Sequence, residues 1–257
     1  MAKNWALITG ASEGLGREFA DIAAADGYDL ILVARQAGKL QALADTLREK
    51  HGVAIEVLPT DLNDPAAAEA LWRKAASRRK VDVLVNNAGL GYNGPFTGAD
   101  IAREMSSVMV NVTALTILMK RAVEHMRNQG GGRILNVGSV AGFMPGANMA
   151  VYHATKAYVL SLSEAVAEEL RGTDVSVTVL CPGATATNFA KDAKMEDIGL
   201  FKFQSIPAAR GVAQSGWQAM KAGKRIRVTG LLNNMFAFGP RLGPRALTTR
   251  ITALFLK

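Results

Sequence analysis

The stretch Thr9-Gly10-Ala11-Ser12-Glu13-Gly14-Leu15-Gly16 decides the fold, because it joins an apolar run, residues 5–9, to a segment of helical period. Gly10 permits a tight turn, Gly14 lets the backbone approach a pyrophosphate, and Gly16 lets the helix pack closely on a strand. Phosphates would then face the helix N-terminus, whose free N–H groups favour anions. The loop is an ordinary turn or a nucleotide site, and its place after a first strand favours the nucleotide site.

Apolar runs rich in Val, Ile and Leu alternate with helical stretches along the rest of the chain. This alternation predicts a doubly wound α/β (Rossmann) fold, in which a mostly parallel sheet of about seven strands carries helices on both faces. No linker or repeat interrupts it, so we expect a single domain over residues 1–257. The expected strands are 5–9, 29–34, 54–59, 81–86, 132–137, 175–181 and 225–229. The expected helices are 14–26, 37–50, 65–78, 102–128, 151–171 and 207–222.

Composition excludes several other classes of protein. The 257 residues are 49% hydrophobic and 20% charged, and the 25 glycines have no period, so disordered and fibrous chains do not fit. The single cysteine, Cys181, cannot form an internal disulfide, and the start MAKNWALITG lacks the features of a secretory signal. No apolar run approaches the roughly 20 residues of a membrane-spanning helix. We therefore expect a cytoplasmic protein.

The net charge of +8 is concentrated in one part of the chain. Residues 1–197 hold 20 Lys and Arg with all 22 acidic residues, whereas residues 198–257 hold 10 Lys and Arg and no acidic residue. Basic residues are not interleaved with stacking aromatics, so we expect no nucleic-acid binding. The basic segment is a solvated surface, a subunit contact or a contact for an acidic partner.

Further motifs follow the glycine loop in a fixed order. They are Asp61-Leu62 after the third predicted strand, Asn86-Asn87-Ala88-Gly89 after the fourth, Asn111 within a helix, Ser139 after the fifth strand, Tyr152-xxx-Lys156 in the next helix and Pro182-Gly183 after the sixth strand. Together with the spacing TGxxxGxG, this series resembles the short-chain dehydrogenase/reductase family. The resemblance covers residues 9–187 and weakens after Thr187.

The residue after the second strand bears on the choice of cofactor. In NAD-preferring relatives an acidic residue there binds the adenosine ribose hydroxyls, whereas this chain has Arg35. A guanidinium pairs with a 2′-phosphate, so Arg35, helped by Lys39, favours NADP(H). Glu13 opposes this, because it stands where many NADP-dependent relatives carry Arg or Lys. Alternatively, Arg35 is a surface charge at the start of a helix.

The resemblance also implies where the rest of the cofactor lies. Asp61 and Leu62 address the adenine, although Asp61 could instead cap the helix that starts near Pro65. Thr187 lies near the nicotinamide amide and diphosphate, with Thr185 beside it. The residues expected to bind the cofactor are Gly10, Ser12, Glu13, Gly14, Leu15, Gly16, Arg35, Lys39, Asp61, Leu62, Asn87, Ala88, Gly89, Tyr152, Lys156, Pro182, Gly183, Thr185 and Thr187.

Tyr152 and Lys156 lie four residues apart, on one face of a predicted helix. A phenol of pKa ~10 needs help to act near neutral pH, and a nearby ammonium is expected to lower that pKa. The resemblance implies that Ser139 holds the substrate oxygen and that Asn111 positions a water that feeds protons through Lys156; alone, Asn111 could satisfy backbone at a helix kink. We expect hydride transfer between NADP(H) and a carbonyl or secondary alcohol. The alternative is an NADP(H)-sensing regulator that does no chemistry.

Other reactive residues are weaker candidates. Cys181 is expected to be a small buried thiol. His51, His125 and His153 are scattered, and no His, Cys, Asp and Glu have zinc-like spacing, so we expect no catalytic metal. His153 adjoins Tyr152 in sequence but points about 100° away on a helix, which makes it a poor substrate contact.

Two segments lie beyond the well-matched motifs. In the family a lid follows Thr187, here residues 188–205. The apolar side chains of this lid, with Phe143 and Met144, predict an apolar ketone or ketoacyl-type substrate. Alternatively, the same residues form a subunit contact. Residues 230–257 form a basic extension, with a helix from Pro244 that carries Leu247, Ile251, Leu254 and Phe255 on one face. It packs on its own domain or a sister subunit, or weakly contacts an anionic membrane surface or acidic carrier. The family usually forms dimers or tetramers, and the helix 102–128 has apolar surface enough for a partner.

Overall fold

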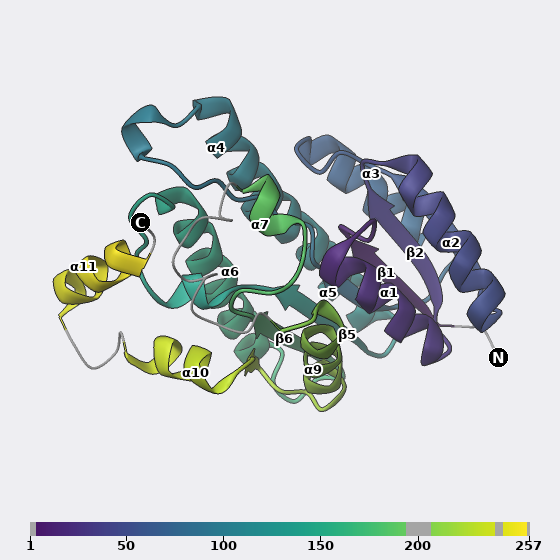
Figure 1. The fold of residues 1–257 in the computed structure, drawn as a ribbon. Coiled ribbons are helices and arrows are strands. Elements are labelled where there is room, and N and C mark those ends of the chain that lie inside the picture. The colour runs from purple at the N-terminus through teal and green to yellow at the C-terminus, as the bar shows by residue number, and fades with distance from the viewer. Residues whose placement is uncertain (1–3, 194–206, 240–243, 256–257) are drawn as a thin grey trace.

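The computed structural model describes residues 4–193, 207–239 and 244–255, which build a seven-stranded parallel sheet (Figure 1). The strand order is β3-β2-β1-β4-β5-β6-β7, which confirms the predicted doubly wound α/β fold. Every predicted strand is found, with the third starting one residue later and the seventh shorter than expected. The strands are β1 (Trp5–Thr9), β2 (Asp29–Ala34), β3 (Ile55–Pro59), β4 (Val81–Asn86), β5 (Gly132–Val137), β6 (Val175–Cys181) and β7 (Ile226–Val228).

Helices cover both faces of the sheet. On one face lie α1 (Gly14–Ala25), α2 (Ala37–His51) and α9 (Ala209–Lys221); on the other lie α3 (Pro65–Ala76), α5 (Leu115–Asn128) and α6 (Ala150–Glu169). Successive strand residues point to opposite faces, so Ala6 and Ile8 of β1 are buried against the first layer and Leu7 against the second. Two apolar cores therefore hold the sheet, which explains why its strands are continuous apolar runs.

The predicted helix 102–128 is divided into three parts. It consists of α4 (Ile101–Val108), a π-helical turn η2 (Met109–Ala114) and α5. By length and composition alone this 28-residue run could cross a membrane, contrary to the sequence expectation. Core helices of soluble proteins share this length and composition, and Leu118, Met119 and Met126 are buried in the core against the sheet.

The C-terminal part folds beside the carboxyl end of the sheet (Figure 1). After β7 come α10 (Leu231–Phe238), which the sequence did not predict, and α11 (Arg245–Phe255), which confirms the helix expected from Pro244. Helix α10 contacts the 3-10 turn η3 (Val140–Phe143) that follows β5. The remaining short elements are η1 (Phe96–Gly98) and α7 (Phe189–Asp192).

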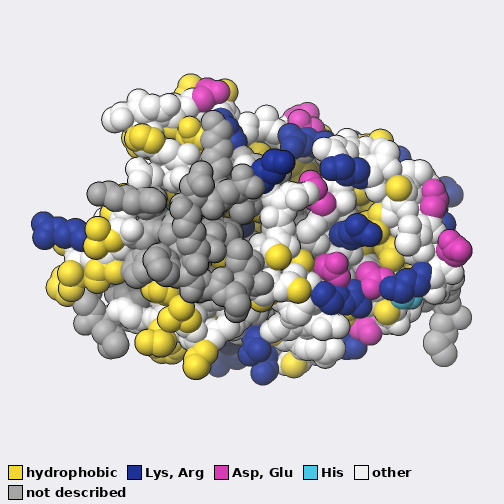
Figure 2. Space-filling view, viewed as in Figure 1, with side chains coloured by type: hydrophobic (Ala, Val, Ile, Leu, Met, Phe, Trp, Pro, Cys, Tyr) yellow, Lys and Arg dark blue, Asp and Glu magenta, His cyan; other side chains and the backbone are white. Residues whose placement is uncertain are grey.

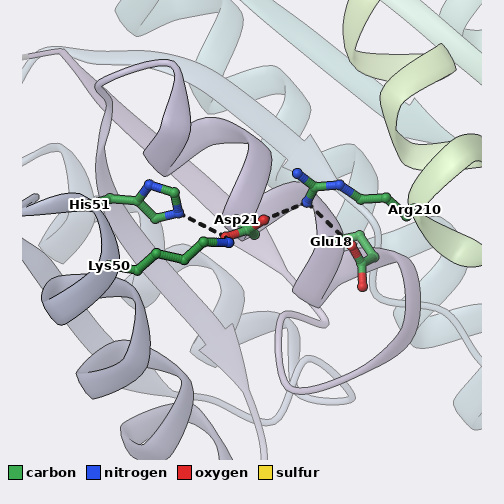
Figure 3. Close-up of polar contacts among 5 residues, drawn as sticks. All are labelled: Glu18, Asp21, Lys50, His51 and Arg210. Carbon is green, nitrogen blue, oxygen red and sulfur yellow. Dashed lines mark hydrogen bonds and ion pairs between the residues drawn. The ribbon is translucent and has the colours of Figure 1, made fainter.

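An ionic cluster joins three helices of the first layer (Figure 3). The Asp21 carboxylate on α1 accepts hydrogen bonds from Lys50 Nζ (2.7 Å) and His51 Nε2 (2.8 Å) of α2 and from an Arg210 guanidinium nitrogen (2.6 Å) of α9. Arg210 also pairs with Glu18 at 3.3 Å. Burial raises the pKa of Asp21, but the three hydrogen bonds outweigh burial and lower that pKa to about 2. The charged carboxylate therefore contributes to stability.

Replacing Asp21 with Asn should lower the free energy of unfolding at pH 7 by about 2 kcal/mol. A carboxyl whose pKa is lowered on folding stabilises the protein above its unfolded value near 4, and that contribution is lost as the pH falls toward 2. The gap between wild type and variant in urea denaturation should thus close between pH 4 and 2. The control Asp45→Asn removes an exposed ion pair with Arg48 and should cost under about 0.5 kcal/mol. A gap that persists unchanged at pH 2 would contradict the assignment.

Candidate active site

One cavity of about 620 Å³ collects the loops that follow the first six strands. The strands are parallel, so their carboxyl ends lie on one rim, and the cavity opens where the strand order reverses between β1 and β4. Of the residues expected to bind the cofactor or to act in catalysis, all but Gly16, Lys39 and Asn111 line this cavity. The structure therefore brings together residues that lie as far apart in the chain as Gly10 and Thr187.

The loops after β1 and β4 are fastened by Thr9, a residue to which the sequence assigned no role. Its hydroxyl oxygen accepts the N–H groups of Asn87 (2.9 Å) and Ala88 (3.0 Å). In return, Asn87 Nδ2 donates to the carbonyl oxygens of Thr9 (2.9 Å) and Gly10 (3.2 Å). These bonds fix the glycine loop against its neighbour across the switch point.

The glycines are required by close approach and by backbone conformation. A Cβ on Gly16 would lie 2.1 Å from the Gly10 carbonyl oxygen, an impossible contact. Gly10 and Gly14 have φ values of +64° and +56°, a region that disfavours L side chains. A Cβ on Gly14 would also press on Thr187 Cγ2 at 3.1 Å, so the segment after β6 lies directly against this loop.

The far end of the cavity is lined by the ends of β2 and β3, with Arg35 exposed there. None of the ion pairs among the described residues includes Arg35. Lys39 Nζ instead lies 3.6 Å from the Glu13 carboxylate, which also accepts a 2.6 Å hydrogen bond from Asn188. Of the two cations that follow β2, Lys39 therefore forms an ion pair with Glu13 and Arg35 does not.

The structure rejects the alternative that Asp61 caps the next helix. Asp61 accepts the Asn63 N–H at 3.0 Å in a local turn, whereas Asp64 caps α3 by accepting the Ala66 N–H at 2.8 Å. Asp61 is exposed and lines the cavity beside Leu62, which is buried in the core. Its carboxylate therefore remains available to a ligand.

Ser139, Tyr152 and Lys156 all line the middle of the cavity. The Ser139 hydroxyl oxygen accepts the Ala141 N–H (3.1 Å), and the hydroxyl donates a long 3.5 Å bond to the Pro182 carbonyl. Tyr152 and Lys156 lie one turn apart on α6, with Lys156 Nζ 5.7 Å from the centre of the tyrosine ring. All three side chains are at least nine-tenths buried, which limits their contact with water.

Burial dominates the protonation of Tyr152 and Lys156. It raises the pKa of Tyr152 to about 12, opposed by a hydrogen bond with Ser139, and it lowers the pKa of Lys156 to about 8. The net shift of the Tyr152 pKa is therefore upward, against the expected lowering by Lys156, whose ammonium donates to the Val137 carbonyl at 2.9 Å. At neutral pH the phenol therefore keeps its proton.

Asn111 lies behind the cavity wall, in the π-helical turn η2. Its Oδ1 accepts the Leu90 N–H (2.8 Å), and its Nδ2 donates to the Leu90 carbonyl (2.8 Å) and to Thr155 Oγ1 (3.0 Å). A Cβ on Gly89 would lie 3.4 Å from Asn111 Oδ1 and 3.6 Å from Lys156 Nζ, so both atoms face Gly89. Asn111 thus fixes the backbone of the cavity wall beside Lys156. This agrees with the alternative that its side chain satisfies backbone groups at a helix kink.

His153 is closer to the site than its helical position suggested. It lines the cavity, and its ring meets that of Tyr152 edge-on at 6.2 Å. Its Nδ1 is hydrogen-bonded to the Met144 carbonyl at 2.8 Å, and burial lowers its pKa. A neutral His153 therefore anchors the loop that follows Ser139.

Cys181 is a buried thiol, as expected, and burial raises its pKa to about 12. Within the described ranges, His, Cys, Asp and Glu side chains form no group of three that could hold a metal ion.

The remaining wall of the cavity is largely apolar. Met144 lines it as predicted, but Phe143 does not, because its ring packs against the core instead. Phe189, from the predicted lid, lies 5.6 Å from the Tyr152 ring centre, while residues 194–205 of that lid lie outside the described residues. Several cavity-lining residues that the sequence missed come from the C-terminal helices; they are Asn233, Met235, Phe236, Thr248 and Thr252.

Comparison with known proteins identifies the family. The model of the short chain dehydrogenases matches residues 4–197. The chain belongs to this family. It is 32% identical to the ketoacyl reductase HetN of Nostoc sp. over 84% of this chain and 74% of that protein, although matches to two other relatives span 61% and 66% of their lengths.

Solved structures agree with this assignment. A short-chain dehydrogenase from Sphingobium yanoikuyae in complex with NADPH is 33% identical, covers 89% of this chain and 88% of its own, and has a TM-score of 0.83. A bulky-bulky ketone specific alcohol dehydrogenase from Comamonas testosteroni is 30% identical, with coverages of 88% and 86% and a TM-score of 0.79. Similar structures include complexes with NADPH and with NAD, so the family supports a nicotinamide cofactor and chemistry at CH–OH or C=O groups.

Proposed function

We propose that the protein is an NADP(H)-dependent reductase of apolar ketones or ketoacyl-type compounds, working in either direction. One observation carries this proposal: Ser139, Tyr152 and Lys156 share a cavity with the glycine loop and Arg35. The same arrangement disfavours the alternative of a catalytically silent NADP(H) sensor, because such a sensor has no need of a buried acid beside a buried ammonium. We further propose that the enzyme is cytoplasmic, in keeping with its lone buried cysteine.

The glycine loop fits a dinucleotide. Its positive-φ glycines leave backbone open at the start of α1, where a side chain would fill the space, and Arg35 offers a fork for a 2′-phosphate. Asp61 and Leu62 would lie beside the adenine, and Thr185 and Thr187 at the nicotinamide end. When bound, the nicotinamide group supplies or accepts the hydride.

The chain's own residues handle the substrate oxygen and its proton. Ser139 and Tyr152 donate hydrogen bonds to the carbonyl oxygen, the serine giving up its long bond to Pro182. Tyr152 then transfers its proton to that oxygen as negative charge develops there. Lys156 is largely protonated at neutral pH, because its pKa is about 8, and its charge 5.7 Å from the ring stabilises the phenolate left behind.

Support for an apolar substrate comes from the cavity wall. Met144, Met149, Phe189, Leu247 and Ile251 line it around the reacting side chains. An apolar wall binds hydrocarbon and leaves sugar hydroxyls without partners. The ketoacyl reductase and bulky-ketone dehydrogenase among the similar proteins point the same way.

A homodimer or homotetramer is the assembly we propose. Ile101 (72% exposed) and Met105 (43%) on α4 and Tyr158 (38%) on α6 are exposed on two helices that contact each other. Such surface on a long helix pair suits a partner subunit.

Replacing Tyr152 with Phe should reduce turnover by roughly 10²–10⁴ while NADPH still binds, because the change removes the acid and keeps the ring. Steady-state kinetics with fluorescence titration of NADPH measures both quantities. Tyr158→Phe is the matched control: it lies on the same helix, its hydroxyl bonds only Thr116 among the described residues, and turnover should not change. Near wild-type reduction by the Tyr152 variant would refute the mechanism.

Arg35→Asp should lower kcat/KM for NADPH by about 10- to 100-fold and favour NADH, because a charge-assisted partner of the 2′-phosphate becomes a repelling acid. The control Arg73→Asp makes the same change of charge on exposed α3 and should leave the cofactor ratio unchanged. An unaltered NADPH-to-NADH ratio in the Arg35 variant means that another cation reads the phosphate.

Lengthening the alkyl chain of a ketone substrate should raise kcat/KM by up to about fourfold per CH₂, the equivalent of ~0.8 kcal/mol of buried hydrocarbon. The assay follows NADPH oxidation along a homologous series, with ketose sugars of matched size as the polar control. A flat or falling series, or a preference for the sugars, would exclude the apolar pocket.

A further inference from the structure

Helices α10 and α11 present apolar side chains on two sides. Their inner side lines the cavity through residues such as Asn233 and Thr252, both of which are buried. Their outer side leaves Leu231 85% exposed and Leu254 71% exposed. Figure 2 shows hydrophobic side chains gathered over both helices on one face of the molecule. The exposed apolar residues Leu231, Leu232, Met235, Leu247, Ile251 and Leu254 are here called the C-terminal patch; of these, Met235, Leu247 and Ile251 also line the cavity.

The charged side chains of α10 and α11 are all basic. Arg245 and Arg250 are exposed on α11, and the chain contains no acidic residue between positions 198 and 257. Exposed Leu, Ile and Met beside Arg, without Asp or Glu, is the composition of helices that lie in a membrane interface. Exposed apolar side chains gathered on one face also mark a binding face rather than an ordinary solvated one.

A second copy of the chain fits this surface less well. A two-fold interface pairs the same patch with itself, so it would bring Arg245 and Arg250 toward like charges with no local acid to neutralise them. An anionic lipid surface satisfies both properties, since headgroup phosphates pair with arginine and the acyl boundary accepts the leucines.

We propose that the C-terminal patch docks the protein on an anionic phospholipid membrane surface. Leu231, Leu232 and Leu254 enter the interface, while Arg245 and Arg250 bind lipid phosphates. Because the same helices wall the cavity, docking turns its apolar side toward the membrane, so that a membrane-dissolved ketone enters without crossing water. This last step rests on the proposed function; the docking itself does not.

Co-sedimentation of the full-length protein with vesicles tests the docking. The wild type should bind vesicles of phosphatidylserine and phosphatidylcholine in equal parts, bind pure phosphatidylcholine poorly, and dissociate as salt is raised. Arg245→Glu/Arg250→Glu should weaken binding at least about 30-fold, and Leu231→Ser/Leu254→Ser about 100-fold. None of these four residues lines the cavity, so turnover of a water-soluble ketone should not change.

Matched controls separate the patch from general effects. Arg73→Glu/Arg127→Glu makes the same change of net charge on α3 and α5, and Phe96→Ser removes a comparably exposed apolar residue at η1, outside the proposed subunit contact. Both controls should bind vesicles like the wild type. The proposal is overturned if the wild type ignores anionic vesicles, if the controls lose binding equally, or if the patch variants only dissociate an oligomer in analytical ultracentrifugation. Because vesicle binding needs no catalysis, a failed docking and a failed enzyme assay remain distinguishable.

Discussion

The site depends on a close contact between two backbone segments that leaves no room for a side chain. Gly16 packs against the Gly10 carbonyl, and Asn87 closes over the same point with its amide while Thr9 holds the Asn87 N–H. This contact sits where the sheet order reverses, so it sets the separation of the two halves of the fold. If a side chain forced these loops apart, the rim that carries Arg35 on one half and Ser139 on the other would lose its alignment.

Much of this arrangement could be predicted because it is encoded locally. Strand boundaries follow from continuous apolar runs between helical stretches, and parallel strands place successive loops on one rim whatever lies between them. Tyr152 and Lys156 were assigned to one helix face by a spacing of four alone. These inferences need no knowledge of distant contacts, which is why they agree with the structure so closely.

What could not be predicted depends on distant contacts. The place of Asn233 above Gly183 depends on how α10 returns across the sheet, and nothing in its local sequence indicates that return. Asp61 and Asp64 are both plausible caps within one cluster, and only the backbone geometry separates them. The protonation of Tyr152 is set by how completely it is buried, a property of the whole cavity rather than of a motif.

Two side chains interact with the same Glu13 carboxylate at the edge of the cavity. This carboxylate is shared between Lys39 on α2 and Asn188 in the segment that follows β6. An anion arriving beside Lys39 competes with Glu13 for that ammonium, while a Glu13 freed from Lys39 keeps its bond to Asn188. One carboxylate therefore joins α2 to the segment that follows β6. A substitution at Glu13 changes the surroundings of Lys39 and the attachment of Asn188 together, so the two cannot be altered separately at this position.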